Sequence, residues 1–150
     1  MPDDRPDSQS DITGGKSLYS ISGILIATIL GSLAAGILLI YLNYLSLGYG
    51  KLAKLTIRWG IVAYTLIITL GLLIPDSRAF TALFIVLQTG LAGIAADRLQ
   101  GAAINYHREH GGMMYSPLRA AGLGFLTGVA MLFAIGFLLI AWTLVAGTNQ

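Results

Sequence analysis

Cysteine is absent from this 150-residue chain, so disulfides, thiolate nucleophiles and cysteine-based metal or iron–sulfur sites are excluded. Charge is scarce too, because only 11% of the residues are charged, against about 25% in an average soluble domain. With 55% hydrophobic residues the chain could not cover its surface in water, which predicts that its solvent is the bilayer. The net charge of +2 is too small to suggest a nucleic-acid partner.

Acidic and basic side chains are also missing from the middle of every long apolar run. Proton-coupled pumps and small multidrug exporters usually depend on an intramembrane carboxylate with a shifted pKa, so this absence argues against that class. A neutral-solute facilitator or channel stays open. The sequence has no phosphate-binding loop after a strand and no arranged Ser–His–Asp set, which favours a non-enzymatic protein without a cofactor.

Four apolar runs are long enough to cross a bilayer as helices, at about residues 21–42, 55–74, 79–96 and 120–143. All four prolines lie before the first run or at a helix boundary. We therefore expect an all-α integral membrane four-helix bundle over residues 21–147, with short connections, behind a disordered acidic tail at residues 1–20. Good helix formers after residue 96 predict a helical cytoplasmic extension of the third helix.

Small residues recur at every fourth position of the first apolar run, GILIATILGSLAAGILLIYL. This spacing lets another helix backbone approach closely. The expected helix-packing positions are Gly23, Ala27, Gly31 and Ala35 in the first helix, Gly93 in the third, and Gly124 and Gly128 in the fourth. They fit either packing within one bundle or the surface of a homo-oligomer or partner subunit.

Gln88 and Tyr64 are candidate polar groups within the membrane. A buried amide in hydrocarbon needs a hydrogen-bond partner, and Gln88 shares its helical face with small residues that are expected to point inward. Gln88 either lines a path for a substrate or a proton-carrying water, or it bonds to Tyr64, Thr65 or Thr69 of the second helix.

His107 and His110 lie three residues apart in the segment HREH. With Glu109 or Asp97 they could form a metal site, and a membrane metalloenzyme is the enzymatic alternative. The spacing is not that of an HExxH motif, and cations at a helix C-terminus suit the helix dipole. We therefore expect a solvated helix end without a metal.

The stretch GSLAAGILLIYLNYLSLG at residues 31–48, followed by the ordered set Gln100, His107, Gly111, Gly112 and Ser116, resembles small multi-pass bacterial membrane proteins without an assigned activity. The resemblance implies four transmembrane helices in a bacterial cytoplasmic membrane. It singles out Asn43, Gln100, His107 and Gly112 as candidate loop positions, to which His110 is added from its spacing.

Basic residues predict the orientation. Six lie in the connections after the first and third runs, namely Lys51, Lys54, Arg58, Arg98, Arg108 and Arg119, against three on the opposite side. This bias places those connections in the cytoplasm and both termini outside. We expect a non-enzymatic accessory protein or complex subunit that acts through helix packing, with the lipid bilayer and a homo-oligomer or membrane protein as partners. The alternative is an oligomeric small-solute transporter or channel component.

Overall fold

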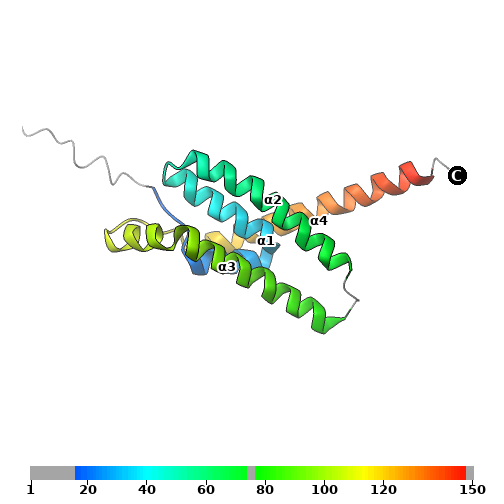
Figure 1. The fold of residues 1–150 in the computed structure, drawn as a ribbon, viewed down its shortest axis with the longest axis horizontal. Coiled ribbons are helices and arrows are strands. Elements are labelled where there is room, and N and C mark those ends of the chain that lie inside the picture. Colours follow the sequence, from blue (N-terminus) through cyan, green and yellow to red (C-terminus); the bar gives the residue numbers. More distant parts are fainter. Residues whose placement is uncertain (1–15, 74–76, 148–150) are drawn as a thin grey trace, which may run out of the picture.

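Four helices make up the computed structural model, which describes residues 16–73 and 77–147. In chain order they are α1 (Ile21–Ser46), α2 (Gly50–Leu72), α3 (Arg78–Glu109) and α4 (Pro117–Gly147) (Figure 1). The described residues contain no strand, and each helix is long and apolar enough to cross a membrane, which confirms the predicted all-helical four-helix fold. Residues 1–15, with most of the predicted tail, and the predicted turn at Pro75 lie outside the described residues.

Local sequence explains where the helices begin and end. The Ser20 hydroxyl accepts from the Gly23 amide at 3.1 Å, and the Ser77 hydroxyl accepts from the Phe80 amide at 3.3 Å, so both serines are N-caps. Pro117 is the first residue of α4, a position that needs no amide hydrogen. Gly111 follows the end of α3 with φ of +75°, a conformation that glycine adopts without strain.

α1 is folded back on itself. Gly31 (φ −124°, ψ 15°) and Ser32 (φ 66°, ψ −177°) leave the helical conformation and separate a first arm, residues 21–30, from a second arm, residues 33–46. The Tyr19 amide donates to Asn43 Oδ1 at 2.7 Å, whereas a straight helix would hold these residues about 36 Å apart. The structure thus differs from the expected single crossing over residues 21–42, because the two arms form a hairpin.

The hairpin is the centre of the bundle, since α2, α3 and α4 each pack against α1. α4 lies along the first arm, and α2 lies against the second arm, where Gly60 contacts Ile37. α3 contacts both arms, with Gly93 against Leu25 of the first and Ala92 against Gly36 of the second. The core therefore forms around the hairpin and not around a central axis of four straight helices.

One end of the molecule gathers three segments, residues 16–20, 47–49 and 110–116, and is called the loop end below (Figure 1). The Leu18 amide donates to the Met113 carbonyl at 3.2 Å, and the Tyr115 amide donates to the Leu18 carbonyl at 2.9 Å. Leu18 and Tyr19 are 0% and 2% exposed, so the fold begins before residue 20, where the tail was expected to end.

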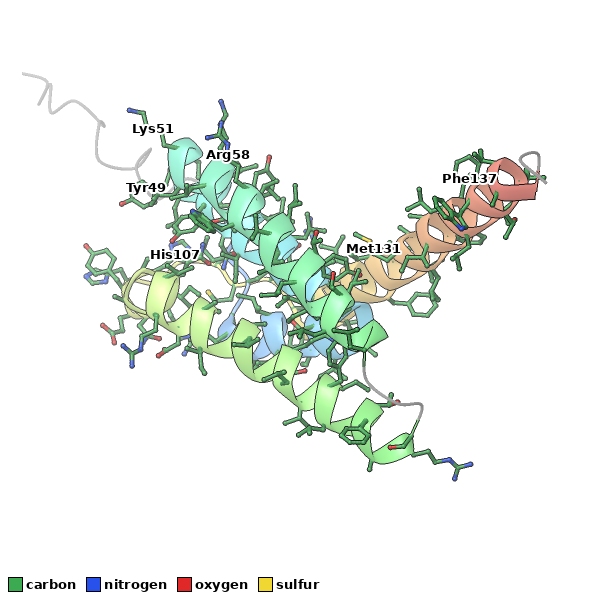
Figure 2. All side chains as sticks on the ribbon, turned by 45° about the vertical axis from the view of Figure 1, so that its right-hand side comes forward. Tyr49, Lys51, Arg58, His107, Met131 and Phe137 are labelled. Atoms are coloured by element: carbon green, nitrogen blue, oxygen red, sulfur yellow. The ribbon has the colours of Figure 1, made fainter. Side chains whose placement is uncertain are left out.

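The second half of α4, residues 129–147, diverges from the bundle. Residues up to Ile135 still line pockets with α1 and α2, and the rest projects away from the loop end (Figure 1, Figure 2). The start of the described chain and the end of α4 thus lie at opposite ends of the molecule. This arrangement follows from the hairpin, which returns the chain to the loop end before α2 begins.

Candidate functional site

A buried amide network holds the loop end together. Asn43, from the second arm, accepts from the Tyr19 amide through Oδ1 and donates from Nδ2 to the Tyr19 carbonyl at 2.9 Å and to Gln100 Oε1 at 3.2 Å. Gln100, from α3, donates to the Ile40 carbonyl at 2.8 Å. Both amide side chains are buried, at 0% and 1% exposure.

The network closes the hairpin. Asn43 satisfies both main-chain groups of Tyr19, which a turn or a strand would otherwise have to pair. Leaving one such buried group without a partner costs about 1–3 kcal/mol, so each amide stabilises the contact of the N-terminal segment with α1 and α3. A polar pair in the core thus fixes the path of the chain.

An aromatic and cationic cluster covers this network at the surface. The Tyr19 and Tyr115 rings lie 4.5 Å apart, and the Arg119 guanidinium lies 4.0 Å from the centre of the Tyr115 ring. Burial raises the pKa of the Tyr19 hydroxyl, while Arg119 acts in the opposite direction. Tyr19 is therefore neutral at physiological pH, and the single positive charge of Arg119 is what this cluster presents.

The two histidines have separate partners. His107 Nε2 lies 3.1 Å from the Met113 carbonyl, and its ring lies against Gly112. His110 Nδ1 lies 2.8 Å from the Tyr106 carbonyl, and its ring stacks on Tyr106 at 3.9 Å. Among the described residues no group of three His, Asp or Glu side chains could hold a metal ion. His107, in the last turn of α3, thus contacts the loop that pairs with Leu18, whereas His110 is the C-cap of α3.

Gln88 reaches the break in the hairpin. Its Oε1 accepts from the Leu33 amide at 3.1 Å, and the side chain is 8% exposed. The expected partners in α2 are wrong, because the break at Ser32 leaves a main-chain donor at the start of the second arm. Tyr64 packs instead against the small apolar cluster of Leu33, Ile67 and Ala92.

Ser32 is the feature that sequence reasoning missed. Its φ of 66° and ψ of −177° lie in a region that residues other than glycine rarely adopt. Its hydroxyl oxygen is buried and has no hydrogen-bond partner. Neither property has a sequence signal beyond the adjacent Gly31, since serine occurs freely within helices.

The small-residue stripes of α1 and α4 lie against each other in parallel. A Cβ atom at Gly23 would lie 3.3 Å from Ala120 Cβ, one at Gly124 would lie 2.6 Å from Ala27 Cα, and one at Gly128 would lie 2.9 Å from the Leu30 carbonyl. The Gly31 backbone contacts the Gly124 carbonyl directly. The stripes therefore serve packing between the first arm and α4, and Ala35, 1% exposed, lies in the main core.

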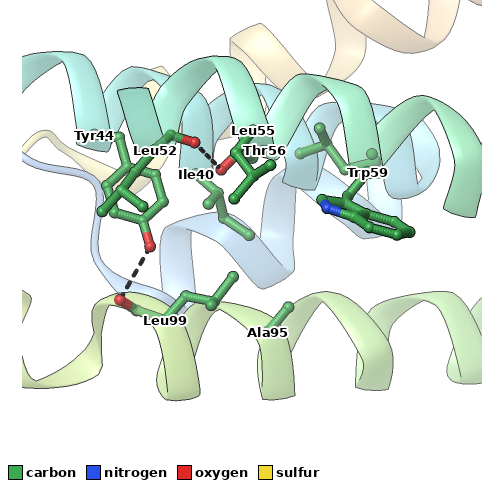
Figure 3. Close-up of a pocket in the computed structure, with 10 residues that line it drawn as sticks. Ile40, Tyr44, Leu52, Leu55, Thr56, Trp59, Ala95 and Leu99 are labelled. Carbon is green, nitrogen blue, oxygen red and sulfur yellow. Dashed lines mark hydrogen bonds between the residues drawn. The ribbon is translucent and has the colours of Figure 1, made fainter. Parts of the chain in front are cut away.

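An apolar cavity of about 330 Å³ lies between α2, α3 and the second arm (Figure 3). Tyr44 bounds it at the loop end, where the tyrosine hydroxyl donates to the Leu99 carbonyl at 3.2 Å. Trp59 and Gly60 of α2 lie at its other end. It can take an apolar ligand and offers few polar atoms to a solute.

The structure brings Asn43 together with Gln100, and His107 together with Gly112, although these residues come from three separate segments. Their contacts are made within the chain. No protein-family model matches this chain, and no similar protein is found among the curated proteins or the solved structures.

Proposed function

We propose that this protein is a multi-pass membrane protein in which α2, α3 and α4 cross the bilayer and α1 enters and leaves at one surface. The apolar length of α2, α3 and α4 supports three crossings. The hydrogen bonds between Tyr19 and Asn43 support a hairpin that returns to its own side. Irregular backbone is tolerated within a bilayer where protein buries it, and Gln88 and α4 cover the break between the arms.

The charges support a cytoplasmic loop end. Seven of the eight described basic residues lie toward this end of the helices, and Arg78 lies at the other. The seven are Lys16, Lys51, Lys54, Arg58, Arg98, Arg108 and Arg119. By the positive-inside rule the N-terminal segment is then cytoplasmic and α4 ends outside, in a bacterial cytoplasmic membrane as the resemblance implies.

In this membrane the protein acts as a non-enzymatic subunit through helix packing. The observation that carries this role is the projecting half of α4, which is apolar on every side and lies outside the bundle (Figure 2). Leu132, Phe133, Phe137 and Trp142 are 72–76% exposed. A transmembrane helix of another protein, or of a second copy, can pack along this half without burying a charged side chain.

Transport is the weaker alternative. Its principal candidate, Gln88, bonds to the Leu33 amide, and this contact lies in the packed interface between α1 and α3. The amide is thus occupied in holding the hairpin.

Photo-crosslinking in native membranes tests the subunit role. A photoreactive residue at Phe137, on the projecting half, should give one discrete protein adduct, at twice the mass of the chain if the partner is a second copy. The control is Val62, 57% exposed on α2, which should give lipid adducts alone. Lipid adducts alone at both positions would contradict the proposal.

A further inference from the structure

The cavity beside Trp59 has the form of a groove that follows the helices. Its α2 wall runs from Leu52 at the loop end to Gly60, and eight residues of helix span about 12 Å. Half of a bilayer's hydrocarbon core measures about 15 Å. The groove thus follows one leaflet over most of its depth, in the direction in which a lipid chain lies.

The lining of the groove suits hydrocarbon. Ile37 and Ile40 of the second arm line it. Leu55 lies on the α2 wall, and Ala95 and Leu99 lie on the α3 wall (Figure 3). Thr56 is turned back on its own helix, because its hydroxyl donates to the Leu52 carbonyl at 2.9 Å. The side-chain polar atoms left in this lining are the Trp59 indole N–H and the Tyr44 hydroxyl, and the Tyr44 hydroxyl already donates to the Leu99 carbonyl.

One cation on each wall flanks the loop end of the groove. Lys51 directly precedes Leu52 on one wall, and Arg98 directly precedes Leu99 on the other. Both side chains are exposed, whereas Lys54 lies on the face of α2 that is turned away from Leu52 and Trp59. With Asp97, the acid on this turn of α3, which lies against Gly101, Lys51 and Arg98 leave a net charge of about +1. This surface complements an anionic headgroup.

We propose that the groove holds one acyl chain of an anionic phospholipid from the loop-end leaflet, with the lipid phosphate beside Lys51 and Arg98. The occupant must be amphipathic, because the groove is apolar within and cationic at its mouth. A lysine or arginine stem can lie along the groove while its charge reaches the headgroup. This site rests on the proposed membrane placement and adds a ligand to it.

The chain carries its own probe for this site. Its two tryptophans are Trp59, on the groove, and Trp142, on the projecting half of α4. The Trp142→Phe variant leaves the groove probe, and the Trp59→Phe variant leaves the control. Each variant is reconstituted into phosphatidylcholine vesicles that contain a small share of brominated lipid, either phosphatidylglycerol or phosphatidylcholine, and quenching of the tryptophan fluorescence is measured.

Quenching of Trp59 should show that the anionic lipid binds at least about fivefold more tightly than the neutral lipid. The reason is that each nearby cation strengthens the binding of an anionic lipid about fivefold. Trp142 should not distinguish the two lipids. Equal quenching of Trp59 by both lipids overturns the site. If neither lipid quenches Trp142, the membrane placement itself fails, which is a separate result.

Two pairs of variants locate the binding. Ala95→Phe fills the groove and should abolish the preference of Trp59 for the anionic lipid, whereas Val86→Phe, at a position 66% exposed on the same helix, should keep it. An Ala95→Phe variant that folds, by circular dichroism, and retains the preference would overturn the proposal.

The charge pair stays informative if Ala95→Phe does not fold. The double variant Lys51→Gln, Arg98→Gln should reduce the preference at least about fivefold, while Arg78→Gln, at the other end of α3, should leave it unchanged. An unchanged preference in the double variant would overturn the headgroup position.

Discussion

Replacing Ser32 by glycine should stabilise the protein, which few core substitutions do. The backbone of Ser32 has φ of 66° and ψ of −177°, and its hydroxyl is buried without a partner. Glycine relieves about 1–3 kcal/mol of backbone strain and about 1–3 kcal/mol from the unpaired hydroxyl, and loses about 0.5–1 kcal/mol through greater freedom of the unfolded chain. Even the smallest gains leave the variant more stable by about 1 kcal/mol.

Unfolding by dodecyl sulfate in mixed micelles, followed by circular dichroism, measures this free energy of unfolding. Ser32→Ala removes the unpaired hydroxyl but keeps the backbone strain, so its free energy of unfolding should rise by the hydroxyl term alone, about 1–3 kcal/mol. Ser32→Gly gains the strain term as well, before its chain-entropy loss is subtracted. Ser22→Gly is the control, because Ser22 is exposed in the first turn of α1; it should lose at least about 0.5 kcal/mol, since it also gives up an exposed hydrogen bond to the Ser20 hydroxyl. A Ser32→Gly variant no more stable than the parent would refute the strained hairpin.

The same unfolding assay checks two further contacts. Gly124→Ala should cost about 1–3 kcal/mol, because its Cβ would lie 2.6 Å from Ala27 Cα, whereas Gly122→Ala meets nothing within 4 Å and should gain about 0.5–1 kcal/mol; equal effects would contradict the close packing of α4. Gln100→Leu should cost about 1–3 kcal/mol and be non-additive with Asn43→Leu, since they share a hydrogen bond. Additive losses would show that the two amides act independently.

The outer helices could be predicted from the sequence because their boundaries carry local signals. Ser77 and the Ser116–Pro117 pair begin α3 and α4, and glycine follows the end of α3. The hairpin of α1 carries no comparable signal, since both of its arms are buried and the whole run is uncharged. Length and hydropathy cannot distinguish one straight crossing from two buried arms joined at Ser32.

The long-range polar contacts were predictable in part. The resemblance singled out Asn43, Gln100, His107 and Gly112, and in the structure Asn43 contacts Gln100 and His107 contacts Gly112. Their partners are main-chain groups of Tyr19, Ile40 and Met113, and a sequence pattern does not show which carbonyl or amide a fold leaves unpaired. For the same reason Gln88 could be predicted as an inward-pointing amide, whereas its bond to Leu33 depends on the break.

Cysteine accessibility tests the re-entrant hairpin most directly, because the chain has no cysteine of its own. Single variants Ser17→Cys, Ser46→Cys and Gly147→Cys are treated with a membrane-impermeant maleimide in spheroplasts and in inverted vesicles. The hairpin predicts labelling of Ser17→Cys and Ser46→Cys from one side of the membrane and of Gly147→Cys from the other. Labelling of Ser17→Cys and Gly147→Cys from one side, with Ser46→Cys on the opposite side, would mean that α1 crosses the membrane and would contradict the account.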